Sequence, residues 1–92
     1  MLGKVKKALR MVTDAYDDQL NDLIESALAD LGVAGVTNKN TYDPLVRNAV
    51  ITYVMMNFGE PDEYDRLKAS YDEQKAQLSM HTGYTEWGGV DG

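Results

Sequence analysis

Cysteine is absent from this 92-residue chain and histidine occurs once, so two side chains that often carry nucleophilic or acid–base chemistry are almost missing. Without cysteine there is no disulfide framework, no thiolate nucleophile and no cysteine-ligated zinc. The single histidine, His81, lies just past an expected helix end, and no serine or cysteine motif accompanies it. We interpret it as a helix-terminus residue rather than a catalytic base, and we expect no enzymatic activity.

Long apolar runs are also missing. No stretch approaches the roughly 18 apolar residues of a membrane span, and the basic residues 1–10 contain no apolar core of a signal peptide. We therefore expect an intracellular soluble protein without membrane contacts.

Acidic residues are plentiful, but their spacing matches no cation site. Asp14, Asp17, Asp18 and Asp22 have no His or Cys beside them, and they lack the Asp-x-Asp-x-Asp-Gly pattern and distal Glu of a calcium loop. The GxGxxG and GxxxxGK[ST] patterns that cradle phosphates are absent as well. We expect a solvated acidic face, with neither a metal nor a cofactor.

Basic residues are outnumbered, nine against fifteen acids, and the net charge of −6 repels a phosphate backbone. The two signs are segregated: residues 1–10 carry four bases and no acid, and residues 11–31 carry six acids and no base. A helix-turn-helix DNA-binding protein, the alternative function, needs a basic recognition helix. None of the long helices predicted below is basic, so this alternative is disfavoured.

Helical periodicity is clearest over residues 14–31. Six apolar residues there recur at steps of three and four, and they are Leu20, Leu23, Ile24, Ala27, Leu28 and Leu31. Thr13 or Asp14 is expected to cap this helix, Asp17 and Asp18 to favour its positive end, and Gly32 to stop it.

Two further long helices are predicted, at residues 43–58 and 61–80. Asp43 and Pro44 form an N-cap and first-position pair, and the broad apolar stripe that follows indicates a central helix ending at Gly59, with Met55 and Met56 as core filler. The helix from Pro61 has a narrow apolar seam, at Tyr64, Leu67, Tyr71 and Leu78. Its exposed side is expected to carry helical ion pairs between Asp62 and Arg66, Asp65 and Lys68, and Asp72 and Lys75.

A short N-terminal helix completes the predicted fold, with Val5, Leu9 and Val12 on its apolar side. The fold class is therefore all-α, a small bundle of about four helices in one domain over residues 1–92, with a flexible C-terminal tail at 81–92. So short a chain buries only roughly 60 to 65 per cent of its unfolded surface, which favours further stabilisation by self-assembly.

Two segments indicate contacts with other proteins. The basic patch Lys4, Lys6, Lys7 and Arg10 suits an acidic protein surface, such as the Asp-rich helix of a neighbouring copy, better than phosphates. The tail contains Tyr84 and Trp87, and such aromatics either anchor an interface or pack back onto the bundle. Both interpretations of the tail stay open from the sequence.

The most distinctive motifs of the chain are DPLVRNAV at 43–50, YV at 53–54, NFGEPDEYDRL at 57–67 and SYDEQK at 70–75. In these motifs the chain resembles the head-tail connector, or adaptor, proteins of tailed bacteriophages and prophages. KKALR at 6–10, DDQLNDLI at 17–24 and GYTEW at 83–87 extend the likeness over almost the whole chain.

The resemblance implies a ring of about twelve copies beneath the portal, through whose lumen DNA passes without specific binding. Its partners would be the portal protein and a stopper or tail-completion protein, and its place would be the virion neck. By this analogy Tyr84 and Trp87 dock to the portal. The residues expected at the subunit interface are Lys6, Lys7, Arg10, Asp17, Asp18, Asp22, Arg66 and Tyr71.

Overall fold

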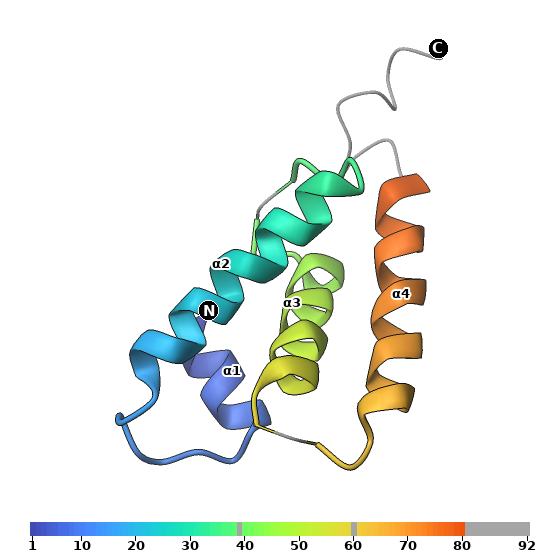
Figure 1. Cartoon of the computed structure of the whole chain (residues 1–92). Helices are drawn as coiled ribbons and strands as arrows, with labels where there is room; N and C mark the ends of the chain where they lie inside the picture. Colours follow the sequence, from blue (N-terminus) through green and yellow to red (C-terminus); the bar gives the residue numbers. More distant parts are fainter. Residues whose placement is uncertain (39, 60, 81–92) are drawn as a thin grey trace.

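The computed structural model describes residues 1–38, 40–59 and 61–80 of the chain. These residues form four helices and no β-strand, which confirms the all-α fold class. The helices are α1 (Leu2–Ala8), α2 (Asp17–Val33), α3 (Pro44–Asn57) and α4 (Tyr64–Met80) (Figure 1). The tail predicted at residues 81–92 lies outside the described residues.

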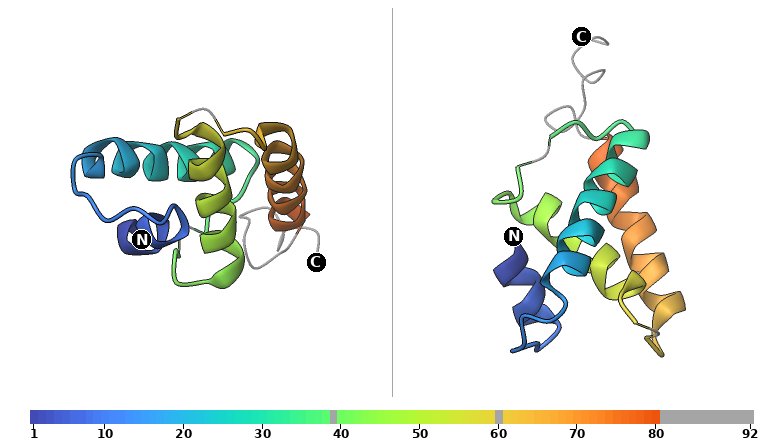
Figure 2. Two further views of the ribbon diagram at one scale, coloured as in Figure 1. Left: turned by 90° about the horizontal axis from the view of Figure 1, so that it is seen from below. Right: turned by 60° about the vertical axis from the view of Figure 1, so that its left-hand side comes forward.

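Helix α3 is the centre of the fold, as its broad apolar stripe predicts. It lies between α2 and α4 and also contacts α1, as the views in Figures 1 and 2 show. The Asp43 side chain accepts a hydrogen bond of 2.9 Å from the Leu45 backbone N–H, so the predicted cap is confirmed. The core side chains that α3 contributes are Val46, Ala49, Val50, Val54 and Met56.

Helix α2 begins three residues and ends two residues later than predicted. Neither Thr13 nor Asp14 caps it: the Thr13 hydroxyl accepts instead from the Ala15 N–H, and the N-cap is Tyr16, which makes no side-chain cap. The buried face at Leu20, Ile24, Ala27 and Leu31 is as expected.

The C-terminal stop of α2 is Gly35 and not Gly32, which remains inside the helix. Gly35 has a φ of 93°, a left-handed conformation that favours glycine. The Gly35 N–H donates to the Gly32 carbonyl at 3.0 Å, and the Val36 N–H donates to the Leu31 carbonyl at 2.9 Å. These two bonds form a Schellman motif, and the buried Val36 supplies its hydrophobic contact.

Helix α4 begins at Tyr64, because residues 61–63 form a turn in which the Tyr64 N–H donates to the Pro61 carbonyl. Its narrow seam is confirmed at Leu67, Tyr71 and Leu78, all buried, but Tyr64 is 42% exposed and lies outside the seam.

The exposed ion pairs of α4 also differ from those predicted. Arg66 pairs with Glu63 instead of Asp62, and Lys68 pairs with Asp72 at 2.8 Å instead of Asp65. Lys75 reaches across to α2, as described below.

Helix α1 is anchored by one fully buried side chain, Val5. The helix ends at Ala8 and Arg10 has a φ of 56°, so the chain turns away before Val12. Val12 is 98% exposed, and the prediction that it shares the apolar side of this helix is wrong.

Candidate assembly surfaces

Lys6 of α1 joins the two oppositely charged segments within one chain. Its ammonium donates a hydrogen bond to Asp14 Oδ1 at 2.5 Å and lies 3.0 Å from Asp17 Oδ1, a contact that is an ion pair. The hydrogen bond to Asp14 and, after it, the contact with Asp17 raise the pKa of Lys6. The same hydrogen bond to Lys6 lowers the pKa of Asp14. Lys6 therefore fastens α1 to the start of α2.

The remaining charges of these segments stay at the surface. Lys4, Lys7 and Arg10 are exposed and make no ion pair within residues 1–38, 40–59 and 61–80. The same holds for Asp18, Asp22 and Glu25 on α2. Neutralisation by Lys6 thus leaves a basic edge at Lys4, Lys7 and Arg10 and an acidic face at Asp18, Asp22 and Glu25.

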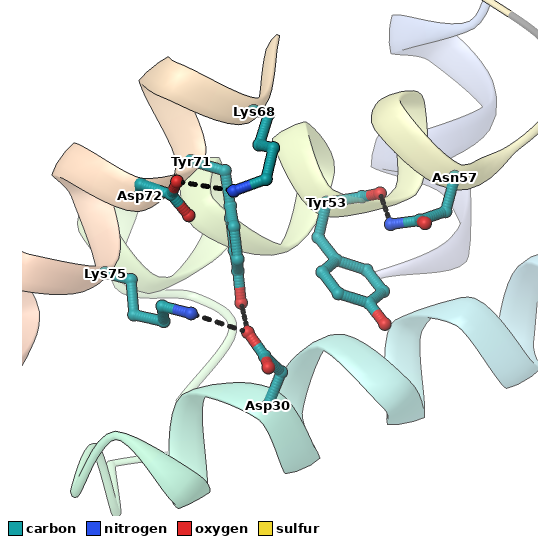
Figure 3. Close-up of polar contacts among 7 residues, drawn as sticks. All are labelled: Asp30, Tyr53, Asn57, Lys68, Tyr71, Asp72 and Lys75. Carbon is teal, nitrogen blue, oxygen red and sulfur yellow. Dashed lines mark hydrogen bonds and ion pairs between the residues drawn. The ribbon is translucent and has the colours of Figure 1, made fainter. Parts of the chain in front are cut away.

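A polar clamp ties the end of α2 to α4 (Figure 3). The Tyr71 hydroxyl donates to Asp30 Oδ2 at 2.5 Å, and the Lys75 ammonium donates to the same oxygen at 3.2 Å. The Lys75 ammonium also lies 5.2 Å from the centre of the Tyr71 ring, within cation–π range. Helix α4 packs chiefly on α3 and has few contacts with α2. The clamp therefore joins two helices that share little apolar packing.

The Tyr71 ring is part of the core although its hydroxyl is polar. The side chain is 2% exposed, and the ring meets Tyr53 of α3 edge-on at 5.3 Å between centroids. Burial, and then the hydrogen bond to Asp30, raise the pKa of the Tyr71 hydroxyl. Sequence analysis missed this clamp because Asp30 and Tyr71 are 41 residues apart and neither helix alone shows a pairing pattern.

The eight predicted subunit-interface residues thus fall into two groups. Five of them have side chains on the surface, and they are Lys7, Arg10, Asp18, Asp22 and Arg66. Three are engaged inside the chain, and they are Lys6, Asp17 and Tyr71. The predicted portal-docking residues Tyr84 and Trp87, and the helix-terminus residue His81, lie outside the described residues.

An open groove of about 480 Å³ runs between the start of α3 and the end of α4. It is lined by Leu45, Asn48, Gln74, Gln77, Leu78 and Met80. The Gln74 side-chain oxygen is buried and accepts no hydrogen bond from any described residue. The sequence hinted at this feature only through the position of Gln74, a polar residue where the heptad expects an apolar one.

Neither a metal cluster nor a membrane span is found in the part of the chain that the structure describes. No three His, Cys, Asp or Glu side chains in that part are arranged to hold an ion. None of its helices is both long enough and apolar enough to cross a bilayer.

The segregated surface charges and the open groove are typical of a small helical protein that binds other molecules through its surface. Comparison with family models then shows the family: the model of the phage connector proteins matches residues 1–85, and the chain belongs to that family. The resemblance to phage connectors is confirmed, and the family is one of structural proteins. Searches of the curated proteins and of the solved structures gave no significant match.

Proposed function

We propose that this protein is the head-tail connector subunit of a tailed phage or prophage, a ring-forming adaptor beneath the portal. The observation that carries the proposal is the match to the phage connector family over residues 1–85. In this role the chain assembles in the host cytoplasm and resides in the virion neck. A ring of about twelve copies lengthens the DNA channel and offers a docking surface to the stopper or tail-completion protein.

The separated surface charges support a head-to-tail contact between copies. The basic edge of one copy, with Lys7 and Arg10, is complementary to the acidic face of the next, with Asp18 and Asp22. Two different surfaces that meet in this way close into a ring when the rotation between copies permits. Each exposed pair contributes only about 0.2 to 1 kcal/mol, so the charges mainly select the register and the partner.

The structure changes which residues we propose for this contact. Lys6 and Asp17 already pair with each other, so their charges largely neutralise one another within one copy. Tyr71 is buried, and its hydroxyl forms part of the clamp that holds α4 against α2. Arg66 is exposed on α4 beside Glu63 and remains a candidate for the outer edge of the contact.

The net charge of −6 suits a channel through which DNA passes without sticking, because acidic walls repel the phosphate backbone. Tyr84 and Trp87 are proposed to dock to the portal, since aromatic side chains are the usual anchors of protein interfaces.

Mass photometry of the purified protein, alone and with its cognate portal, tests the proposal. A ring, or a stoichiometric complex with the portal, is expected; a monomer that ignores the portal contradicts the connector role. Trp87→Ala should weaken portal capture and leave the helical circular dichroism unchanged, whereas unchanged capture would reject the docking role of the tail.

Charge reversal tests the contact between copies. Asp18→Lys with Asp22→Lys replaces attraction by like-charge repulsion and should weaken the ring, and adding Lys7→Glu with Arg10→Glu should restore it. The matched control is Asp65→Lys with Asp72→Lys, which makes the same charge change on a different face of α4 from Arg66 and removes only the exposed ion pair between Lys68 and Asp72. If the control pair disrupts the ring as strongly as the α2 pair, net charge matters and the proposed contact is wrong.

A further inference from the structure

The groove between α3 and α4 has the form of a binding site. Leu78, only 2% exposed, forms an apolar floor, while Leu45 and Met80, 46% and 82% exposed, stand at its borders. Its volume of about 480 Å³ is within the range of roughly 300 to 1,000 Å³ usual for pockets that hold a small organic group.

The polar side chains of the groove narrow the choice of occupant. They are the amides of Asn48, Gln74 and Gln77, which carry no charge, so the site is not built for an ion. The buried Gln74 oxygen lacks a hydrogen-bond donor among the described residues, and a buried acceptor is normally satisfied. The oxygen has almost no accessible surface, so the Gln74 amide has to rotate toward the groove to meet an occupant. An occupant with a large apolar body and one N–H donor would then satisfy it.

We propose that the occupant is the C-terminal segment of the same chain, residues 81–92, with the Trp87 indole seated in the groove. An indole has this combination of apolar faces and a single N–H donor. It also suits the Met80 thioether, because sulfur makes favourable contacts with aromatic rings. Trp87 is the only tryptophan in the chain.

The length of the segment permits this arrangement. It begins directly after Met80, which borders the groove, and Trp87 follows seven residues later. Seven extended residues span at most about 25 Å. The lining residues of α4, from Met80 back to Gln74, cover only about 9 Å of helix, so the segment is long enough to turn and run back along the groove.

Attachment to the same chain favours this occupant over a second copy. A short tether holds the indole near the groove at an effective concentration of the order of millimolar. The inference stands without the connector role. If both hold, the portal and the groove compete for Trp87, and the groove shields the aromatic tail until a portal is present.

Fluorescence of the single tryptophan tests the proposal on the full-length protein. The wild-type emission is expected to be shifted to the blue, with acrylamide quenching well below that of free N-acetyltryptophanamide. Leu45→Lys should shift the emission to the red and raise the quenching to that of the free compound. Gln77→Lys, at an exposed position of the groove, should act in the same direction with little effect on the core.

Tyr64→Lys is the matched control, because it also places a lysine in the first turn of a helix, at a residue of similar exposure, 42% against 46%. Its emission should equal that of the wild type. Circular dichroism of each variant establishes that the helices persist.

Three outcomes overturn the proposal. The first is a wild-type emission typical of an exposed indole. The second is a blue-shifted emission that neither groove variant alters, since Trp87 is then buried elsewhere. The third is a red shift on dilution of the wild type, which assigns the groove to the tail of a second copy.

Discussion

Replacing Tyr71 by Phe removes the hydroxyl from the clamp and leaves the rest of the contact unchanged. The ring stays in the core beside Tyr53, so no cavity forms and the apolar burial is retained. What is lost is one hydrogen bond to a carboxylate, from Tyr71 to Asp30. The measured change in the free energy of unfolding therefore isolates the polar link between α2 and α4.

The magnitude follows from the burial of the two partners. A hydrogen bond to a charged group contributes about 1.5 to 3 kcal/mol net. Asp30 is 37% exposed and keeps Lys75 as a donor, so water and Lys75 replace part of the loss. We expect Tyr71→Phe to lower the free energy of unfolding by about 1 to 2 kcal/mol, and the melting temperature by about 4 to 16 °C.

Urea unfolding followed by circular dichroism measures this change, with an unchanged slope showing that the unfolded surface is the same. A double-mutant cycle with Asp30→Ala should give a coupling energy close to the single effect of Tyr71→Phe. A change below about 0.5 kcal/mol, or no coupling with Asp30, would refute the reasoning, because α4 would then be held by its apolar seam alone.

The remaining predictions concern the end of α2, alkaline pH and DNA. Gly32→Ala should stabilise the protein by about 0.5 to 1 kcal/mol, because the position is helical with open space for a methyl group. Gly35→Ala should destabilise it by about 1 kcal/mol or more, because the residue has a positive φ. Thermal melts measure both changes, and equal effects of the two substitutions would contradict the assignment of Gly35 as the residue that ends α2. The folded state raises the pKa of Tyr71 above its ordinary 10.0 and that of Lys6 above 10.5, so their contributions are complete below pH 10 and are lost as the pH rises further. The urea midpoint of unfolding should therefore decrease above pH 10, and Tyr71→Phe should make this decrease smaller. An equal decrease in the variant would show that ionisation of Tyr71 does not contribute to the loss of stability. Binding to duplex DNA in low salt should be negligible in a gel-shift assay, and tight salt-dependent binding would favour the helix-turn-helix alternative.

The helices themselves could be predicted from local patterns, since each has an apolar face that repeats at helical spacing. The central position of α3 was also predictable, because its stripe is too broad for burial on one side. The exact ends of the helices were harder to predict. Gly32 and Gly35 are equally good stops by composition, and the choice depends on where Val36 finds a buried contact.

The candidate surfaces were predictable only in part. The segregation of charge between residues 1–10 and 11–31 follows directly from the sequence. The sequence does not show which of these charges are unpaired in the fold: Lys6 pairs with Asp14 and Asp17, whereas Lys7 is exposed. Likewise, the groove exists only where the start of α3 meets the end of α4.

The amino-acid sequence alone determined the all-α class, the central helix and the excess of acid, because these depend on local spacing and on composition. The tertiary structure alone decided that Asp30 meets Tyr71 and Lys75, and that the buried Gln74 oxygen has no donor among residues 1–38, 40–59 and 61–80. The physical reason is that helical periodicity specifies which face of a helix is buried, whereas the packing of one helix on another specifies which residues on that face meet.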